Sequence, residues 1–213
     1  MSVLPVVDLR PKFGPARYQG SRPTCLAFAI SDAHSQVRGL PYEELSAEFI
    51  FYHAARRYAV FNPHVGITVD NGLIALKNDG QPLESGWPYL PRIPLDLNSY
   101  EPPADSGYVY RRDATFSAHS DIRTTLDTGR SVLAVMTITT DFHYALPGQV
   151  IRSNSNSQFA GYHAVLVVGY GHENSDIVYL IRNSWGTKWC EAGYAWLAED
   201  YLTKRLHSVV VMG

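Results

Sequence analysis

The chain has 213 residues, enough for one large domain or two small lobes. Its 18 basic and 20 acidic residues give a net charge of −2. This balance excludes the strongly basic surface of nucleic-acid-binding proteins and of polybasic membrane-surface proteins. Hydrophobic residues make up 46% of the chain and charged residues 18%, so we expect a packed core rather than disorder.

The N-terminal segment and the cysteine count bear on the compartment. The first residues have no basic stretch followed by an apolar run, so they do not resemble a secretory signal. No stretch approaches the ~18 consecutive apolar residues of a membrane span. The two cysteines, Cys25 and Cys190, are too few for a disulfide framework. We therefore expect a cytoplasmic protein, although signal-independent export would leave the same sequence.

The first half of the chain predicts three helices. An Ala-rich apolar run over 25–34 follows turn-forming residues, with Thr24 as the expected N-cap. A second helix is expected over 47–57 after Ser46, and a third over 69–78, ending before Gly80. The segment 81–108 is rich in proline and turn residues, which indicates a long irregular connection.

The second half predicts a β-sheet. Short runs rich in Val, Ile and Tyr are separated mostly by Gly, Asn or Asp, as in antiparallel strands. These runs cover 131–139, 163–168, 176–181, 193–197 and 208–212. Helices followed by strands predict an α+β fold with a helical lobe, a β lobe and a cleft between them.

Cys25 and His163 carry the strongest chemical signal. A lone cysteine is most often a small buried hydrophobe, but one in the first turn of a helix faces free backbone N–H groups that favour the nucleophilic thiolate. A cysteine nucleophile needs a base. His163 opens an apolar strand at 163 − 25 = 138 residues after Cys25, and Asn183 follows 20 residues later, where antiparallel pairing can bring it to the imidazole. The other histidines have ordinary explanations on helices or in loops, His143 among the latter.

Three segments together resemble the papain-like cysteine proteases. QGSRPTCLAFA over 19–29 resembles their nucleophile segment, GYHAVLVVGYG over 161–171 their histidine segment and NSWGTKW over 183–189 their asparagine segment. The resemblance spans about residues 5–200 in the family's order. It implies a single papain-like peptidase domain over 1–213, with a helical lobe at about 15–110, a β lobe at about 111–213 and segment 1–14 crossing over.

The resemblance also implies roles for individual residues. Cys25 would be the nucleophile, His163 the base and later the acid, and Asn183 the residue that orients the imidazole. Gln19 would donate to the oxyanion beside the Cys25 backbone N–H, where losing one donor typically costs ~10²–10³ in rate. Trp185 would cover the bond between Asn183 and His163. We expect an ion pair of the Cys25 thiolate and the His163 imidazolium.

The chain also departs from the family pattern. Arg22 stands where the family has the cysteine of a disulfide, and Cys190 where it tends to have glycine; we interpret Cys190 as a bystander. The family's Cys-x-Gly-Gly groove segment has its best counterpart at 69–72. That correspondence predicts a substrate groove lined by Asn71, Gly72 and Tyr162.

The predicted function is therefore thiol endopeptidase activity through a thioester acyl-enzyme. Two alternatives stay open: acyl transfer on the same site, as in a deamidase, transglutaminase or peptide ligase, and a papain-like binding module whose site has decayed. The expected partners are a peptide or protein substrate and a regulatory or inhibitory protein, because the family's long inhibitory segment has no counterpart in the sequence. We expect no nucleic acid, membrane, cofactor or metal, since neither zinc-ligand spacing nor a glycine-rich phosphate loop occurs.

Overall fold

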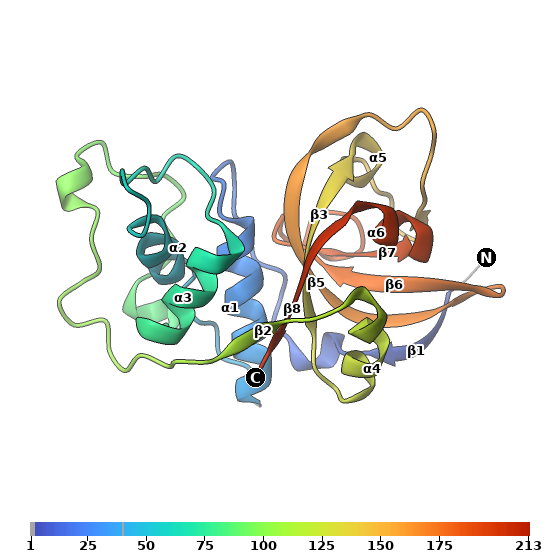
Figure 1. Cartoon of the computed structure of the whole chain (residues 1–213), viewed down its shortest axis with the longest axis horizontal. Helices are drawn as coiled ribbons and strands as arrows, with labels where there is room; N and C mark the ends of the chain where they lie inside the picture. Colours follow the sequence, from blue (N-terminus) through green and yellow to red (C-terminus); the bar gives the residue numbers. More distant parts are fainter. Residues whose placement is uncertain (1–2, 40) are drawn as a thin grey trace.

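The structure, a computed structural model, describes residues 3–39 and 41–213. Its α-helices are α1 (Cys25–Arg38), α2 (Ala47–Ala55), α3 (Val69–Asn78), α4 (Ile122–Asp127), α5 (Thr140–His143) and α6 (Glu199–Arg205). Its strands are β1 (Leu4–Asp8), β2 (Ala114–Phe116), β3 (Val132–Thr139), β4 (Val150–Ile151), β5 (Phe159–Glu173), β6 (Asp176–Arg182), β7 (Tyr194–Ala198) and β8 (Leu206–Met212). Helices α1–α3 gather on one side and the strands on the other (Figure 1), which confirms the predicted α+β class.

The three predicted helices form, with differences at their ends. The bounds of α3 are those predicted, and Ser46 caps α2 by accepting a hydrogen bond from the Phe49 backbone N–H at 3.1 Å. Helix α1 begins at Cys25 as predicted and runs on to Arg38. Thr24 is the N-cap residue of α1, as predicted, but its side chain makes no capping hydrogen bond; its hydroxyl bonds instead to the Tyr89 hydroxyl at 2.9 Å.

The sheet has the strand order β2-β8-β3-β5-β6-β7-β4, with β1 paired to β5. All pairs are antiparallel except β4 with β7. Strand β5 is longer than predicted because its first half pairs with β3 and its second half with β1 and β6. Glycine permits this: a Cβ at Gly169 would lie 2.3 Å from the Val7 carbonyl oxygen, and one at Gly171 2.4 Å from that of Leu4.

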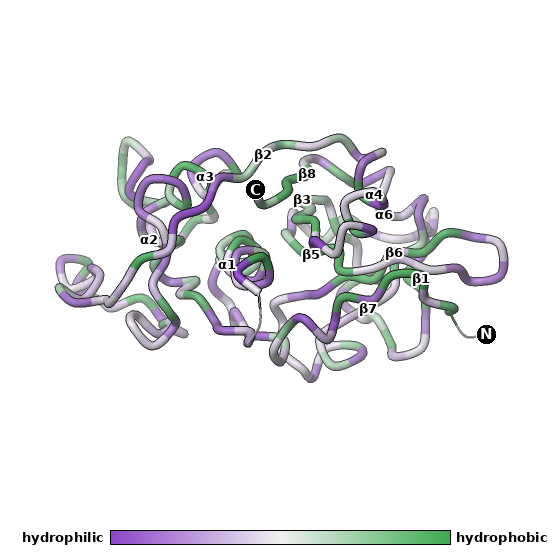
Figure 2. Tube along the Cα trace, turned by 90° about the horizontal axis from the view of Figure 1, so that it is seen from below, coloured by the Kyte–Doolittle hydropathy of each residue, from purple (hydrophilic) through white to green (hydrophobic). Residues whose placement is uncertain are grey.

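Helix α1 lies between the other helices and the sheet, and Figure 2 looks along it. Its buried residues join the apolar residues of β3, β5 and β6 in one hydrophobic core. Buried charge fastens it to the sheet as well. Asp32 accepts hydrogen bonds from Arg17 Nη2 and Arg182 Nε, each at 2.7 Å. Because Arg182 ends β6, this contact joins the middle of α1 to the residue that precedes Asn183.

No helix in the described part of the chain is long and apolar enough to cross a membrane.

Candidate active site

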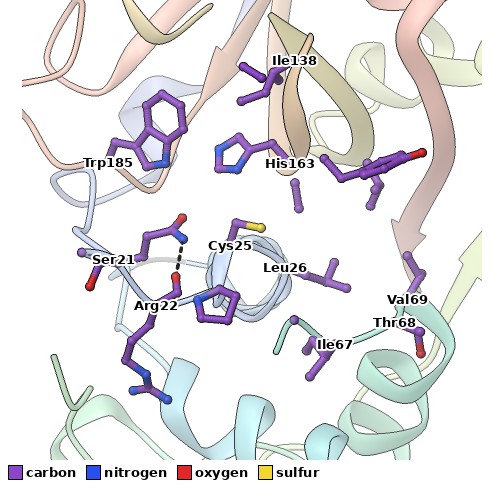
Figure 3. Close-up of a pocket in the computed structure, with 18 of the residues that line it drawn as sticks. Ser21, Arg22, Cys25, Leu26, Ile67, Thr68, Val69, Ile138, His163 and Trp185 are labelled. Atoms are coloured by element: carbon purple, nitrogen blue, oxygen red, sulfur yellow. Dashed lines mark hydrogen bonds between the residues drawn. The ribbon is translucent and has the colours of Figure 1, made fainter. Parts of the chain in front are cut away.

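A pocket of about 540 Å³ opens where the start of α1 meets the sheet. One wall is the loop before α1, a second is the segment before α3, and the third comes from β3 and β5 (Figure 3). The lining residues are Gln19, Gly20, Ser21, Arg22, Pro23, Cys25, Leu26, Gly66, Ile67, Thr68, Val69, Val135, Ile138, His143, Ala160, Tyr162, His163, Ala164 and Trp185. The structure therefore brings together residues from distant parts of the chain.

Cys25 is the first residue of α1 and is partly exposed to this pocket. Burial raises the pKa of its thiol, whereas backbone hydrogen bonds from Ala164, Leu26 and Cys25 itself lower it. These N–H groups belong to the helix N-terminus and to the strand residue that follows His163. They stabilise negative charge on the sulfur, as expected for a thiol in the first turn of a helix.

His163 and Asn183 form a buried hydrogen bond that fixes the imidazole tautomer. His163 Nε2 lies 2.7 Å from Asn183 Oδ1, and the Ser184 backbone N–H donates to the same oxygen at 2.8 Å. A backbone N–H can only donate, so this atom of Asn183 is the amide oxygen, an acceptor. The proton of a neutral His163 is therefore on Nε2, and Nδ1 carries the free lone pair. In Figure 3 the His163 ring faces Cys25 across the pocket.

The environment of His163 disfavours its charged form. The side chain is 5% exposed, and burial lowers its pKa to about 4, against the opposing effect of the hydrogen bond that it donates to Asn183. His143 adds a smaller effect in the same direction. Burial thus acts against charge on both Cys25 and His163, so the predicted ion pair depends on the backbone donors and on the mutual attraction of the two groups. The ion pair stays a prediction.

Gln19 is held at both ends of its side-chain amide. Its Nε2 donates to the Arg22 carbonyl oxygen at 2.8 Å, and its Oε1 accepts from Ser184 Oγ at 2.6 Å. Its backbone N–H also donates to the Ser184 carbonyl oxygen at 2.9 Å. An amide nitrogen carries two hydrogens. The bond to Arg22 uses one of them, and the other can donate to a ligand beside Cys25.

Aromatic rings surround the imidazole of His163. The Trp185 ring centroid lies 4.8 Å from that of His163, and Phe142 and Trp189 complete the enclosure at 5.5 and 5.6 Å from Trp185. His143 stacks on Trp185 at 4.7 Å with an interplanar angle of 12°. Sequence reasoning assigned His143 to an ordinary loop. In the sequence, His143 simply follows Phe142 after an apolar strand, and this pattern does not indicate that it contacts Trp185.

Of the three predicted groove residues, only one lines the pocket. Tyr162 lines the pocket and is exposed, but Asn71 and Gly72 do not line it. Gly72 is buried in α3, where a Cβ would lie 2.6 Å from Ile30 Cδ1, so it serves the contact between α3 and α1. The wall on this side is instead the preceding segment, 66–69. The expectation for Asn71 and Gly72 is thus displaced by a few residues along the chain.

Two other features lie outside this pocket. In the described ranges, no group of three or more His, Cys, Asp or Glu side chains is arranged to hold a metal ion. Cys190 is a free cysteine, and its backbone has a φ of 44°, the left-handed region that favours the glycine typical of this position.

Comparison with known proteins supports the resemblance read from the motifs. The family described as "Papain family cysteine protease" matches residues 96–211, more than half of the chain, which include His163 and Asn183 but not Cys25. "Peptidase 1" of Euroglyphus maynei is 27% identical over 192 residues, covering 87% of this chain and 57% of that protein. "Digestive cysteine proteinase 2" of Homarus americanus is 28% identical over 204 residues, covering 88% and 59%. The chain thus spans less than three fifths of the length of these relatives.

Solved structures of similar fold cover nearly the whole chain. Xylellain, a cysteine protease from Xylella fastidiosa, aligns over 99% of this chain and 86% of its own, with a TM-score of 0.76 and 24% identity. The procathepsin B S9 of Trypanosoma congolense aligns over 100% and 78%, with a TM-score of 0.76 and 20% identity. These likenesses confirm the papain-like α+β fold. The chain belongs to the papain family of cysteine proteases.

Proposed function

We propose that this chain is a cysteine peptidase that cleaves peptide bonds with Cys25, His163, Asn183 and Gln19. The observation that carries the proposal is the Nε2 tautomer of His163, which leaves Nδ1 free to accept a proton in the pocket that holds Cys25. A nucleophile, a base and a residue that orients the base are the three parts that thiol catalysis needs.

The proposed reaction has two halves. The Cys25 thiol passes its proton to His163 Nδ1 while its sulfur bonds to the substrate carbonyl carbon. The resulting oxyanion accepts hydrogen bonds from the Cys25 backbone N–H and from Gln19 Nε2. The carbon–nitrogen bond then breaks, His163 returns the proton to the leaving amine, and a thioester remains. Water, deprotonated by His163, attacks the thioester and releases the carboxylic acid and the thiol.

The pocket walls support a peptide substrate that lies across Cys25. Leu26, Ile67 and Val69 lie on one side of Cys25 in Figure 3, and Trp185 lies on the other. Because His163 protonates the leaving amine, the leaving part of the substrate would pass along the Trp185 side. The acyl part would contact the apolar side. Acyl transfer to another amine uses the same thioester and is the alternative that the experiment must separate.

A diverse peptide library followed by mass spectrometry tests the proposal. New peptide termini are expected with the wild-type chain and with Cys190→Ala, but not with Cys25→Ala. Mass gains of one dalton or cross-linked peptides would support deamidation or transfer instead. An unmodified library with an intact Cys25 thiol would support the decayed binding module. The regulatory partner stays a prediction, which rapid broad cleavage of unfolded casein by the purified chain would contradict.

A further inference from the structure

A buried ion pair lies beneath the loop that leads into Cys25. Arg22 Nη1 and Nη2 donate to the two carboxylate oxygens of Glu48 at 2.6 and 2.9 Å. The Arg22 side chain is 6% exposed and that of Glu48 fully buried. Arg22 also donates to the Leu90 carbonyl oxygen at 2.5 Å, while Glu48 accepts from the Leu90 backbone N–H at 3.0 Å and from the Tyr100 hydroxyl. The guanidinium is thus anchored both to α2 and to the irregular segment after α3.

The same residue contacts Gln19 through its backbone. The Arg22 carbonyl oxygen accepts the hydrogen bond from Gln19 Nε2 at 2.8 Å, which appears as the dashed line in Figure 3. The position of that carbonyl therefore sets the plane of the Gln19 amide and the direction of its second N–H. A further contact reaches the loop from the segment after α3, where the Tyr89 hydroxyl donates to the Gln19 carbonyl oxygen at 2.6 Å.

The loop needs such an anchor because it turns sharply within a few residues. Gly20 has a φ of 64°, and the next backbone hydrogen bond within the loop, from Thr24 N–H to the Arg22 carbonyl oxygen at 2.9 Å, converges on the same acceptor. Small errors in the placement of oxyanion donors are costly, since their effect depends on preorganisation. A bidentate arginine–carboxylate contact fixes direction as well as distance.

We propose that Arg22 and Glu48 are positioning residues of the oxyanion site: their buried pair holds the Arg22 carbonyl, and that carbonyl aims the Gln19 amide at the reacting carbonyl of the substrate. This inference rests on the proposed function. It predicts that the pair acts on the acyl-transfer steps only and acts through Gln19. Its contribution cannot exceed that of the Gln19 donor, for which ~10²–10³ in rate is typical.

The double variant Arg22→Met with Glu48→Gln tests the inference without leaving a buried charge. The introduced glutamine can still accept from the Leu90 N–H through its oxygen and can donate through its NH2 group to the Tyr100 hydroxyl oxygen, and replacing both members of a buried pair is usually well tolerated. Arg22→Lys keeps the charge but loses the two-pronged contact and is the second variant. Arg57→Met, which removes a contact to Asp79 away from the pocket, is the matched control.

Three measurements separate positioning from general loosening. We expect the double variant to lose about 10- to 100-fold in kcat with KM within about threefold, and Arg22→Lys to lose less. Alkylation of Cys25 by iodoacetamide, in which sulfur displaces iodide and no oxyanion forms, should keep its wild-type rate. In a Gln19→Ala background the double substitution should have no further effect on kcat, since the donor that it positions is gone. Arg57→Met should change none of these quantities.

Other results would overturn the inference. They are an unchanged kcat in both variants, a parallel loss of the alkylation rate, and a loss of equal size with and without Gln19. An inactive wild-type chain would overturn the proposed function and this inference with it, whereas an active wild-type chain with a fully active double variant would overturn the inference alone.

Discussion

Replacing Trp185 with alanine should change the pH dependence of catalysis, because Trp185 covers the imidazole of His163. Burial lowers the pKa of His163 from its ordinary value of 6.5 to about 4. At 1.36 kcal/mol per pH unit, this difference is about 3 kcal/mol of penalty on the imidazolium. Trp185→Ala admits water to one face of the ring and should restore part of that lost solvation. The acid limb of kcat/KM should therefore move from about 4 in the wild type toward 6.5 in the variant.

The difference is easily measured at intermediate pH. At pH 5.5 a histidine with a pKa of 4 is about 97% neutral, whereas one with a pKa of 6.5 is about 9% neutral. The wild type should therefore retain nearly its plateau kcat/KM at pH 5.5. The kcat/KM of the variant at pH 5.5 should fall below its plateau, by about tenfold if the solvation of His163 is fully restored. The assay is kcat/KM from pH 3 to 8 on a peptide without ionisable side chains, with tryptophan fluorescence confirming that the chain stays folded.

In the proposed mechanism the acid limb reports the loss of one of two protons from Cys25 and His163 together, and the remaining proton can lie on either group. The experiment therefore tests burial and not the charge state of the pair. Trp87→Ala, which removes a buried tryptophan from the cluster with Phe49 and Tyr100, is the control and should leave the limb in place. A wild-type limb near 6.5, or equal limbs in wild type and Trp185→Ala, would refute the reasoning.

Three further predictions concern the histidines and the two cysteines. His143→Gln should raise the pKa of His163, because His143 lowers it; the acid limb should move to higher pH, and a shift to lower pH would contradict this. Burial lowers the pKa of His34 as well, to about 4, so the unfolded chain binds protons on both histidines at a higher pH than the folded chain does. The contribution of each neutral histidine to the free energy of unfolding is therefore fully present above pH 6.5 and is lost as the pH falls toward 4. Urea unfolding should show about 3 kcal/mol lost per histidine over that range, and a flat profile would refute it. Iodoacetamide at pH 5.5 should label Cys25 before Cys190, because His163 lies in the same pocket as Cys25 and can take its proton, whereas burial raises the pKa of both thiols; His163→Ala should abolish the preference, and equal labelling in the wild type would contradict it.

Helix caps and apolar runs in the sequence predicted the helices and core strands whose formation depends on neighbouring residues. Helix α3 has the predicted bounds, and Ser46 caps α2, because capping acts within one turn of chain. The core strands β3 and β6 lie where their apolar runs indicated. Thr24 is the N-cap residue of α1 as predicted, but its hydroxyl does not cap the helix, because it bonds to Tyr89, a partner 65 residues away in the sequence.

Contacts between distant segments account for what sequence patterns missed. Strand β1 is exposed at Leu4 and Val6, so it lacks the apolar pattern of a core strand and is specified by its pairing with β5. His143 has its position next to Trp185 only because α5 folds back at the end of β3. Motif order and spacing did predict that Cys25 and His163 line one pocket and that Asn183 bonds to His163.

The buried contact of Arg22 with Glu48 also has a redox consequence. In family members with a cysteine at this position, a disulfide braces the nucleophile loop, and a reductant that keeps the catalytic thiol reduced can cut that brace. In this chain the brace contains no sulfur, and both cysteines are free. Thiol reductants therefore act on Cys25 and Cys190 alone. Cys25 can therefore be kept fully reduced without loosening the loop before α1, and the unfolding temperature should be the same with and without dithiothreitol.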